Sequence, residues 1–332
     1  MHIGIVTPAP ARSRKGNRVT ALRWARILGD LGHQVSVDQT CRTGRRLDLL
    51  VAMHARRSYP SIRLFQRQRP EAPLIVALTG TDLYGDLNRS QRAREALDLA
   101  SCLLLLQPDG IRYLPRAVRH KVRTIYQSAP APATTARPLK RIFEVCVVGH
   151  LRPVKDPFRA AMAVRKLPAD SRISISHIGE ALTQHMARHA RREMAVNRRY
   201  RWLGDLPRHL ALKRIQRSRL MVISSKMEGG PNVATEAIAA SVPIISSRIS
   251  GMVGLFGTDY PGYFPVGNSG KLQHLLHRAE TDPAYYGLLK QHCRRARPLV
   301  APRRERASWK QLLREMHPAE RSSRKAPSPQ RR

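Results

Sequence analysis

The stretch SSKMEGGPNVATEAIAASVPIISS, residues 224–247, decides the fold class of this 332-residue chain. An apolar run at 220–223 comes just before it, and a second apolar run at 243–246 lies within it. A turn with two glycines (228–230) and a helical pattern (232–240) separate the two runs. Short apolar runs joined in this way are typical of one β–α–β step of a buried parallel sheet. The stretch therefore predicts an α/β domain.

The turn of this step favours an anionic ligand. The predicted helix starts behind Gly229, Gly230 and Asn232, so free backbone N–H groups and the positive end of the helix dipole face the turn. Glu228 lies in the turn and Glu236 lies one helical turn inside, with seven residues between them. Two carboxylates beside a phosphate-attracting helix start suit a ligand with both hydroxyls and phosphates, such as a nucleotide sugar.

Apolar runs alternate with helical patterns along the whole chain. Strands of the N-terminal half are predicted within 1–8, 33–39, 47–55, 73–84 and 101–108. Strands of the C-terminal half are predicted within 145–148, 173–179 and 200–207, and 247–257 and 260–265 are expected to complete that sheet. Such alternation predicts doubly wound parallel sheets.

Two domains are expected. The length and the 42% hydrophobic composition suffice for two cores. Residues 128–138 are rich in Pro, Ala and Thr and predict a linker between an N-terminal domain, 1–127, and a C-terminal domain, 139–300. The polar, basic end at 318–332 is predicted to be a disordered tail.

Three glycines, Gly251, Gly254 and Gly257, follow a late strand of the C-terminal half. We interpret them as turn residues. They do not match the G-x-G-x-x-G pattern, so they do not indicate a dinucleotide cofactor.

The formal net charge of +37 first suggests affinity for nucleic acid or for anionic membranes. The excess arginines are scattered through predicted helices and turns, however, so arginine on solvated faces explains much of the charge. Anionic substrates are a further explanation, and no specific nucleic-acid partner is expected.

The four cysteines lie far apart, without the spacing of a zinc site or of a disulfide framework. The chain runs directly into its first strand, and no apolar run reaches the roughly 18 residues that a membrane span needs. We therefore expect a soluble, cytoplasmic protein without a transmembrane segment.

A second phosphate-binding element is predicted in FEVCVVGHLRPVKDP, residues 143–157. Gly149 follows a buried strand, and the cations Arg152 and Lys155 come shortly after it. Cations near a departing diphosphate lower the barrier to breaking a sugar–phosphate bond. Two surface cations on a turn are the structural alternative.

The N-terminal half offers candidates at the carboxyl ends of its strands, where open α/β sheets bind ligands. They are Arg14, Lys15, Gly16 and Asn17 in a basic loop, and Thr81 and Asp82 in a polar turn. A solvated loop and an N-cap at Asp82 are the alternatives. His54 ends a strand in a similar place, and a structural role for it is favoured.

The Glu228-x7-Glu236 spacing resembles the signature of GT-B glycosyltransferases related to family 4, which use nucleoside-diphosphate sugars. Three segments together, 3–28, 147–157 and 227–265, resemble more narrowly the selenosugar synthases of selenoneine biosynthesis. The resemblance covers about residues 1–316.

This resemblance implies the GT-B architecture, in which two Rossmann-like domains face a cleft. The C-terminal domain is then the nucleotide-sugar domain and the N-terminal domain is the acceptor domain. A helix at 301–317 is expected to cross back toward the N-terminal domain. The UDP-sugar is a co-substrate, and no cofactor or metal is expected.

The resemblance also implies roles for single residues. Lys155, with Arg152 or His150, neutralises the diphosphate; His150 stands where family 4-like enzymes have an arginine, so both alternatives stay open. Glu228 holds sugar hydroxyls and Glu236 binds the ribose. Backbone N–H groups for sugar or phosphate are expected at Gly149, Gly229, Gly230, Asn232 and Val233. The backbone near Trp202 and Leu203 is expected to contact uracil, with packing as the alternative for Trp202.

The expected reaction moves a hexose or N-acetylhexosamine from UDP-glucose or UDP-N-acetylglucosamine to selenophosphate, giving a 1-seleno-sugar and UDP. The basic loop at 14–17 would hold the acceptor phosphate. Retention and inversion at the anomeric carbon both stay open. Two other functions are alternatives: a family 4-like transferase with a lipid or polysaccharide acceptor at the membrane surface, and a basic nucleic-acid-binding protein.

Overall fold

The computed structural model describes residues 1–13, 15–44, 46–132 and 136–316. Arg14, the middle of the predicted linker and the predicted tail at 318–332 lie outside the described residues.

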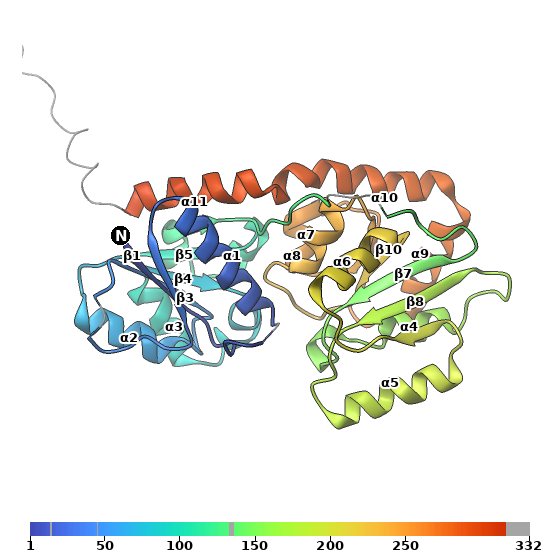
Figure 1. Cartoon of the computed structure of the whole chain (residues 1–332), viewed down its shortest axis with the longest axis horizontal. Helices are drawn as coiled ribbons and strands as arrows, with labels where there is room; N and C mark the ends of the chain where they lie inside the picture. Colours follow the sequence, from blue (N-terminus) through green and yellow to red (C-terminus); the bar gives the residue numbers. More distant parts are fainter. Residues whose placement is uncertain (14, 45, 133–135, 317–332) are drawn as a thin grey trace, which may run out of the picture.

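Two six-stranded sheets, both entirely parallel, form the centres of two domains (Figure 1). The order of the first sheet is β2-β1-β3-β4-β5-β6, and that of the second is β12-β11-β10-β7-β8-β9. The predicted α/β class with two doubly wound parallel sheets is confirmed.

The N-terminal domain alternates strands and helices. Its strands are β1 (His2–Val6), β2 (Gln34–Asp38), β3 (Leu49–Met53), β4 (Leu74–Leu78), β5 (Cys102–Leu105) and β6 (Val122–Thr124). Its helices are α1 (Gly16–Asp30), α2 (Tyr59–Gln68) and α3 (Gln91–Leu99), with short helices η1 (Asp82–Asp86), η2 (Pro108–Tyr113) and η3 (Arg116–Lys121).

The C-terminal domain repeats the plan. Its strands are β7 (Phe143–Val148), β8 (Ile173–Ile178), β9 (Tyr200–Trp202), β10 (Leu220–Ile223), β11 (Ile244–Ser247) and β12 (Tyr263–Phe264). Its helices are η4 (Pro153–Lys155), α4 (Arg159–Val164), α5 (Gln184–Val196), α6 (Arg208–Arg217), α7 (Asn232–Ala239), α8 (Ser250–Phe256), α9 (Ser269–Thr281), α10 (Pro283–Ala296) and η5 (Arg297–Val300).

The order of the second sheet reverses between β7 and β10, which lie side by side. In open α/β sheets, ligands bind outside the carboxyl ends of the strands at such a reversal. The segments that leave these two strands begin at Gly149 and Ser224, so the topology brings the two predicted phosphate-binding elements together.

Strands β3 and β4 are buried at every position, because helices cover both faces of the sheet. The last helix, α11 (Pro302–Met316), packs on the N-terminal domain, where Trp309 lies edge-on to Trp24 of α1 with ring centroids 5.1 Å apart. Figure 1 shows α10 and α11 running along the same side of the two domains.

The expectation that 247–257 completes the sheet with glycine turns is wrong for most of that segment. Residues Ser250–Phe256 form α8, and Gly251 and Gly254 lie inside this helix. Close packing explains both glycines: a Cβ at Gly254 would lie 1.9 Å from Gln107 Oε1, and one at Gly251 would lie 2.3 Å from the Glu228 carbonyl oxygen. Only Gly257 ends a helix, with φ of 81°.

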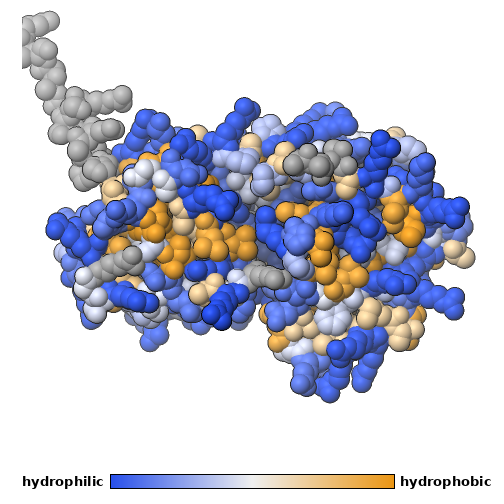
Figure 2. Space-filling view, in the orientation of Figure 1, coloured by the Kyte–Doolittle hydropathy of each residue, from blue (hydrophilic) through white to orange (hydrophobic). Residues whose placement is uncertain are grey.

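Hydrophilic side chains spread over both domains on the face shown in Figure 2, in agreement with the interpretation of many arginines as solvated. In the part of the chain that the structure describes, no helix is both long and apolar enough to cross a membrane.

Candidate active site

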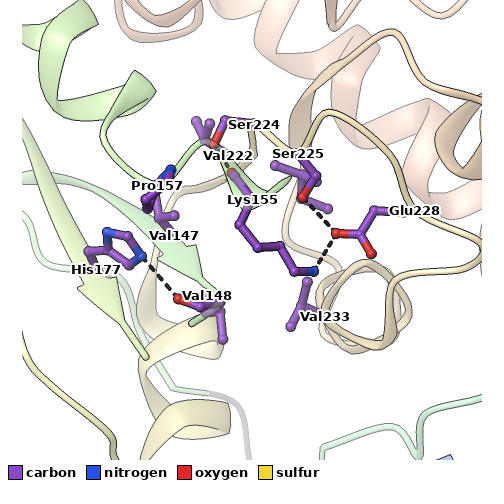
Figure 3. A pocket seen from close by; sticks show the side chains of 12 residues that line it. Val147, Val148, Lys155, Pro157, His177, Val222, Ser224, Ser225, Glu228 and Val233 are labelled. Atoms are coloured by element: carbon purple, nitrogen blue, oxygen red, sulfur yellow. Dashed lines mark hydrogen bonds and ion pairs between the residues drawn. The ribbon is translucent and has the colours of Figure 1, made fainter. Parts of the chain in front are cut away.

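A pocket lies at the carboxyl ends of β7 and β10, where Figure 3 shows its side chains. Both predicted phosphate-binding elements contribute to its lining, which includes Gly149, Lys155, His177, Ser224, Ser225, Glu228 and Val233.

An ion pair closes one side of this pocket. Lys155 Nζ donates a hydrogen bond to Glu228 Oε1, and the Ser225 hydroxyl donates to the same oxygen at 2.6 Å (Figure 3). The Lys155 stem passes Gly149 so closely that a Cβ there would lie 3.8 Å from Lys155 Cδ. The two residues expected to meet diphosphate and sugar are therefore direct partners of each other.

His177 holds the backbone at Gly149 in place. The sequence did not predict a role for this residue. His177 Nε2 lies 3.1 Å from the Gly149 carbonyl oxygen, and Nδ1 lies 3.0 Å from the Tyr200 hydroxyl. Burial lowers the pKa of His177 to about 4, although the hydrogen bond to Gly149 opposes this. The ring is therefore neutral at pH 7, donates from Nε2 and accepts at Nδ1. Its only sequence signal is a polar residue in an apolar strand.

The structure separates the predicted cations. Lys155 lines the pocket, whereas His150 and Arg152 do not. His150 Nδ1 accepts a hydrogen bond from the Glu180 backbone N–H at 3.2 Å, and burial lowers the pKa of His150, which disfavours its charged form. Arg152 Nε is buried and has no hydrogen-bond partner among the described residues.

The second carboxylate of the signature, Glu236, has a partner that the sequence analysis missed. Arg208, the first residue of α6, donates from Nη2 to Glu236 Oε1 at 2.7 Å. Burial raises the pKa of Glu236, and the nearby Arg208 partly offsets this rise. Arg208 is one of many arginines in the sequence, so its position relative to Glu236 along the chain did not indicate that the two residues pair.

The two glycines of the turn contact the N-terminal domain. A Cβ at Gly229 would lie 2.6 Å from the Thr79 carbonyl group, and a Cβ at Gly230 would lie 2.7 Å from Leu106 Cβ. Gly80, whose φ is 133°, faces the Gly229 nitrogen in the same contact. The turn that contains Gly229 and Gly230 approaches the N-terminal domain so closely that a side chain would not fit at either position. The contacts of these glycines with a ligand stay a prediction.

Val233 lines the pocket, but the side chain of Asn232 faces the other domain. Asn232 Oδ1 accepts from Arg23 Nη1 at 2.7 Å, and Asn232 Nδ2 donates to the Thr20 hydroxyl at 3.1 Å. The start of α7 thus lies between the pocket and helix α1.

Trp202 and Leu203 are held by neighbouring backbone. Trp202 Nε1 donates to the Gly179 carbonyl at 2.8 Å, and the Leu203 N–H donates to the His177 carbonyl at 2.8 Å. The Trp202 ring also packs against the C-terminal core. The geometry accounts for this side chain by packing, and the contact with uracil stays a prediction.

In the N-terminal domain, Lys15 of the predicted acceptor loop is exposed and Gly16 begins α1. Asn17 Nδ2 donates to the Thr79 hydroxyl at 3.2 Å. The Gly16 carbonyl accepts from Asn232 Nδ2 at 3.5 Å, so the basic loop reaches the start of α7.

Asp82, a predicted candidate for ligand contact, is not accessible to solvent. Asp82 is 0% exposed, and its carboxylate accepts hydrogen bonds from the backbone N–H groups of Thr79, Gly80 and Ala55 at 2.9 to 3.0 Å. Nor is it an N-cap, since its partners precede it. Asp82 instead shapes the turn that contacts Gly229.

Thr81 is oriented by His54, a buried residue with φ of 75°. His54 Nε2 lies 3.1 Å from the Thr81 hydroxyl, and Nδ1 accepts from the Arg57 N–H at 3.3 Å. Burial lowers the pKa of His54. These contacts give His54 a structural role.

The fold and the pocket define a two-domain protein of the GT-B class. Residues 137–296, which make up most of the C-terminal domain, match the family model of the glycosyl transferases group 1. No curated protein sequence matches the chain significantly.

Solved structures share the fold over nearly the whole chain. HepE of Anabaena in complex with UDP has a TM-score of 0.76 at 15% identity, over 95% of this chain and 99% of that one. Sucrose-phosphate synthase of Thermosynechococcus elongatus has a TM-score of 0.75 at 15% identity, over 95% and 98%. A glycosyltransferase of Rickettsia africae has a TM-score of 0.67 at 12% identity, over 95% and 98%. These likenesses confirm the predicted GT-B architecture.

Proposed function

We propose that the chain is a glycosyltransferase that moves a hexose or N-acetylhexosamine from a UDP-sugar to selenophosphate. The observation that carries the donor half is the Lys155–Glu228 pair beside the start of α7. HepE, which shares the fold, has been solved with UDP and with UDP-glucose, and this likeness supports a uridine nucleotide as donor. The acceptor rests on the resemblance of three segments to selenosugar synthases.

The first role of the site is to stabilise the leaving group. When the donor binds, its diphosphate becomes a second partner for the Lys155 ammonium. Glu228 is then released from part of its pairing and accepts hydrogen bonds from sugar hydroxyls. Preorganised charges at the departing diphosphate contribute most of the barrier reduction in such reactions.

The second role is orientation. Helix α7 directs its first backbone N–H groups toward the diphosphate, and Glu236 accepts hydrogen bonds from the ribose. The selenium of selenophosphate attacks the anomeric carbon, the bond from that carbon to the phosphate oxygen breaks, and its electron pair leaves with UDP. Hydrolysis of the selenium–phosphorus bond by water then yields phosphate and the 1-seleno-sugar.

This proposal is tested by measuring UDP release from UDP-glucose and UDP-N-acetylglucosamine in the presence of selenophosphate, thiophosphate, phosphate or no acceptor. We expect release to depend on selenophosphate. Equal release with all acceptors, or none with any, would contradict the proposed acceptor, and failure to bind either UDP-sugar would contradict the donor.

A further inference from the structure

The guanidinium group of Arg23, on α1, contacts three separate segments of the chain. Its Nε donates to both carboxylate oxygens of Glu305 on α11, at 2.9 and 3.2 Å. Its Nη2 donates to Gln127 Oε1 at 2.7 Å, and its Nη1 donates to Asn232 Oδ1 at 2.7 Å. Asn232 begins α7, so the last bond joins the N-terminal domain to the helix that carries Glu236.

The partners on the N-terminal side hold Arg23 in one orientation. Glu305 is 1% exposed, and it also accepts from Trp24 Nε1 at 2.9 Å and from the Ser128 N–H at 3.0 Å. The Ser128 hydroxyl donates to Glu305 as well. The Arg23 Nε–H is shared between the two Glu305 oxygens, and Nη2 is held by Gln127, so these two partners together fix the plane of the guanidinium. Arg23 is therefore aimed at α7 by contacts that do not involve the C-terminal domain.

A second set of bonds crosses the domain boundary beside the first. Gln127 Nε2 donates to the Gly230 carbonyl, at the end of the glycine turn. The Thr20 hydroxyl donates to Gln127 Oε1 at 2.8 Å and accepts from Asn232 Nδ2 at 3.1 Å. Hydrogen bonds thus join the C-terminal domain to the N-terminal domain at two positions, Gly230 at the end of the turn and Asn232 at the start of α7.

We propose that Arg23 is a positioning residue that fastens the start of α7 to the N-terminal domain, and so sets the donor carboxylates relative to the acceptor side. The effect on donor binding rests on the proposed function, whereas the fastening itself does not. If the two domains separate, the bond to Asn232 breaks while the Arg23–Glu305 pair, which lies within the N-terminal side, stays intact.

The test compares Arg23→Lys with the wild type. Lysine keeps a cation beside buried Glu305, but an ammonium group cannot form the fork that contacts three segments. Arg26→Lys, at an exposed position on the same helix, is the matched control. The first measurement is amide hydrogen exchange in α7 of the ligand-free protein, and the second is the affinity for UDP-glucose.

In Arg23→Lys we expect exchange in the first turns of α7 to be faster by about tenfold and UDP-glucose binding to be weaker by about tenfold, the effect of losing one charge-assisted hydrogen bond. Arg26→Lys should match the wild type in both. Unchanged exchange of α7 in Arg23→Lys would overturn the inference.

Asn232→Ala provides the second variant, which removes the bond to Arg23 together with the bonds to Thr20 and Gly16 and leaves Arg23 paired with Glu305. It should raise exchange in α7 by itself, and adding Arg23→Lys should then have little further effect, because the two residues act through one bond. Full additivity, or unchanged exchange in Asn232→Ala, contradicts the inference. The two proposals can fail separately. If exchange in α7 is faster in the variants but the wild type binds no UDP-sugar, the role of Arg23 in joining the domains is supported and the proposed function is refuted.

Discussion

Lys155 and Glu228 form an ion pair between the segments that leave two neighbouring strands, β7 and β10. Their side chains are 21% and 13% exposed, so solvent screens the pair only in part. The pair keeps a cation and a carboxylate at one end of the sheet, which is the combination that a sugar diphosphate requires.

Replacing Lys155 by Ala should lower kcat by about 10²–10³-fold, because the departing diphosphate then lacks its nearest cation. Glu228→Ala should also lower turnover, through lost contacts with sugar hydroxyls. The measurement is UDP release under saturating acceptor, with circular dichroism to check the fold. Lys226→Ala is the control, since it removes an exposed cation from the same turn. Near-normal turnover in both Lys155→Ala and Glu228→Ala would contradict the site.

Arg208→Ala should change the pH dependence of donor binding. Burial raises the pKa of Glu236 and Arg208 opposes that rise, so removing Arg208 raises the pKa further. Ribose binding needs the ionised carboxylate, and UDP affinity therefore falls as the pH falls through this pKa. The fall should begin at higher pH in Arg208→Ala than in the wild type. Calorimetric titrations with UDP across the pH range measure it, and identical profiles would argue against a role for Glu236 in binding.

His177 should make the protein less stable in mild acid. Its folded pKa of about 4 lies below the ordinary value of 6.5, so its contribution is complete above pH 6.5 and is lost as the pH falls toward 4. For this buried ring the contribution is about 3 kcal/mol. Urea unfolding at pH 7.5 and at pH 5 should show a smaller loss of stability in His177→Gln than in the wild type. An equal loss in both proteins would indicate that other groups cause the acid sensitivity.

Replacing two helical glycines by alanine should change the free energy of unfolding in opposite directions. In Gly254→Ala the new methyl group meets buried Gln107, with Cβ atoms 2.7 Å apart, and we expect a cost of about 1–3 kcal/mol. In Gly287→Ala nothing lies within 4 Å of the new group, so the higher helix propensity should stabilise the protein by about 0.5–1 kcal/mol. Denaturant midpoints measure both. A gain in Gly254→Ala would show that the contact between α8 and Gln107 is loose.

The sequence predicts the sheets well, because apolar runs such as 49–53 and 74–78 carry a local pattern that any parallel sheet requires. Helix α8 was missed for the opposite reason. Gly254 packs on Gln107, more than 140 positions away, and Gly251 packs on the Glu228 backbone, and such close packing leaves no periodic signal in the sequence.

The residues of the candidate site also differ in whether the sequence could predict them. The positions of Lys155, Glu228 and Val233 around one pocket follow from a turn and a helix start that are visible in the sequence. The partners Arg23 and Arg208 come from distant helices, and nothing in a chain rich in arginine distinguishes them. The sequence also could not predict the burial of Asp82, because its hydrogen-bond donors are backbone N–H groups, which every residue except proline has.

Mass spectrometry of the product can detect the proposed transfer of a sugar to selenium. The purified protein is incubated with UDP-glucose or UDP-N-acetylglucosamine and freshly made selenophosphate. We expect a sugar ion with the isotope pattern of selenium, formed in amounts that match the UDP released. UDP-sugar turnover that gives only selenium-free sugar products would contradict it.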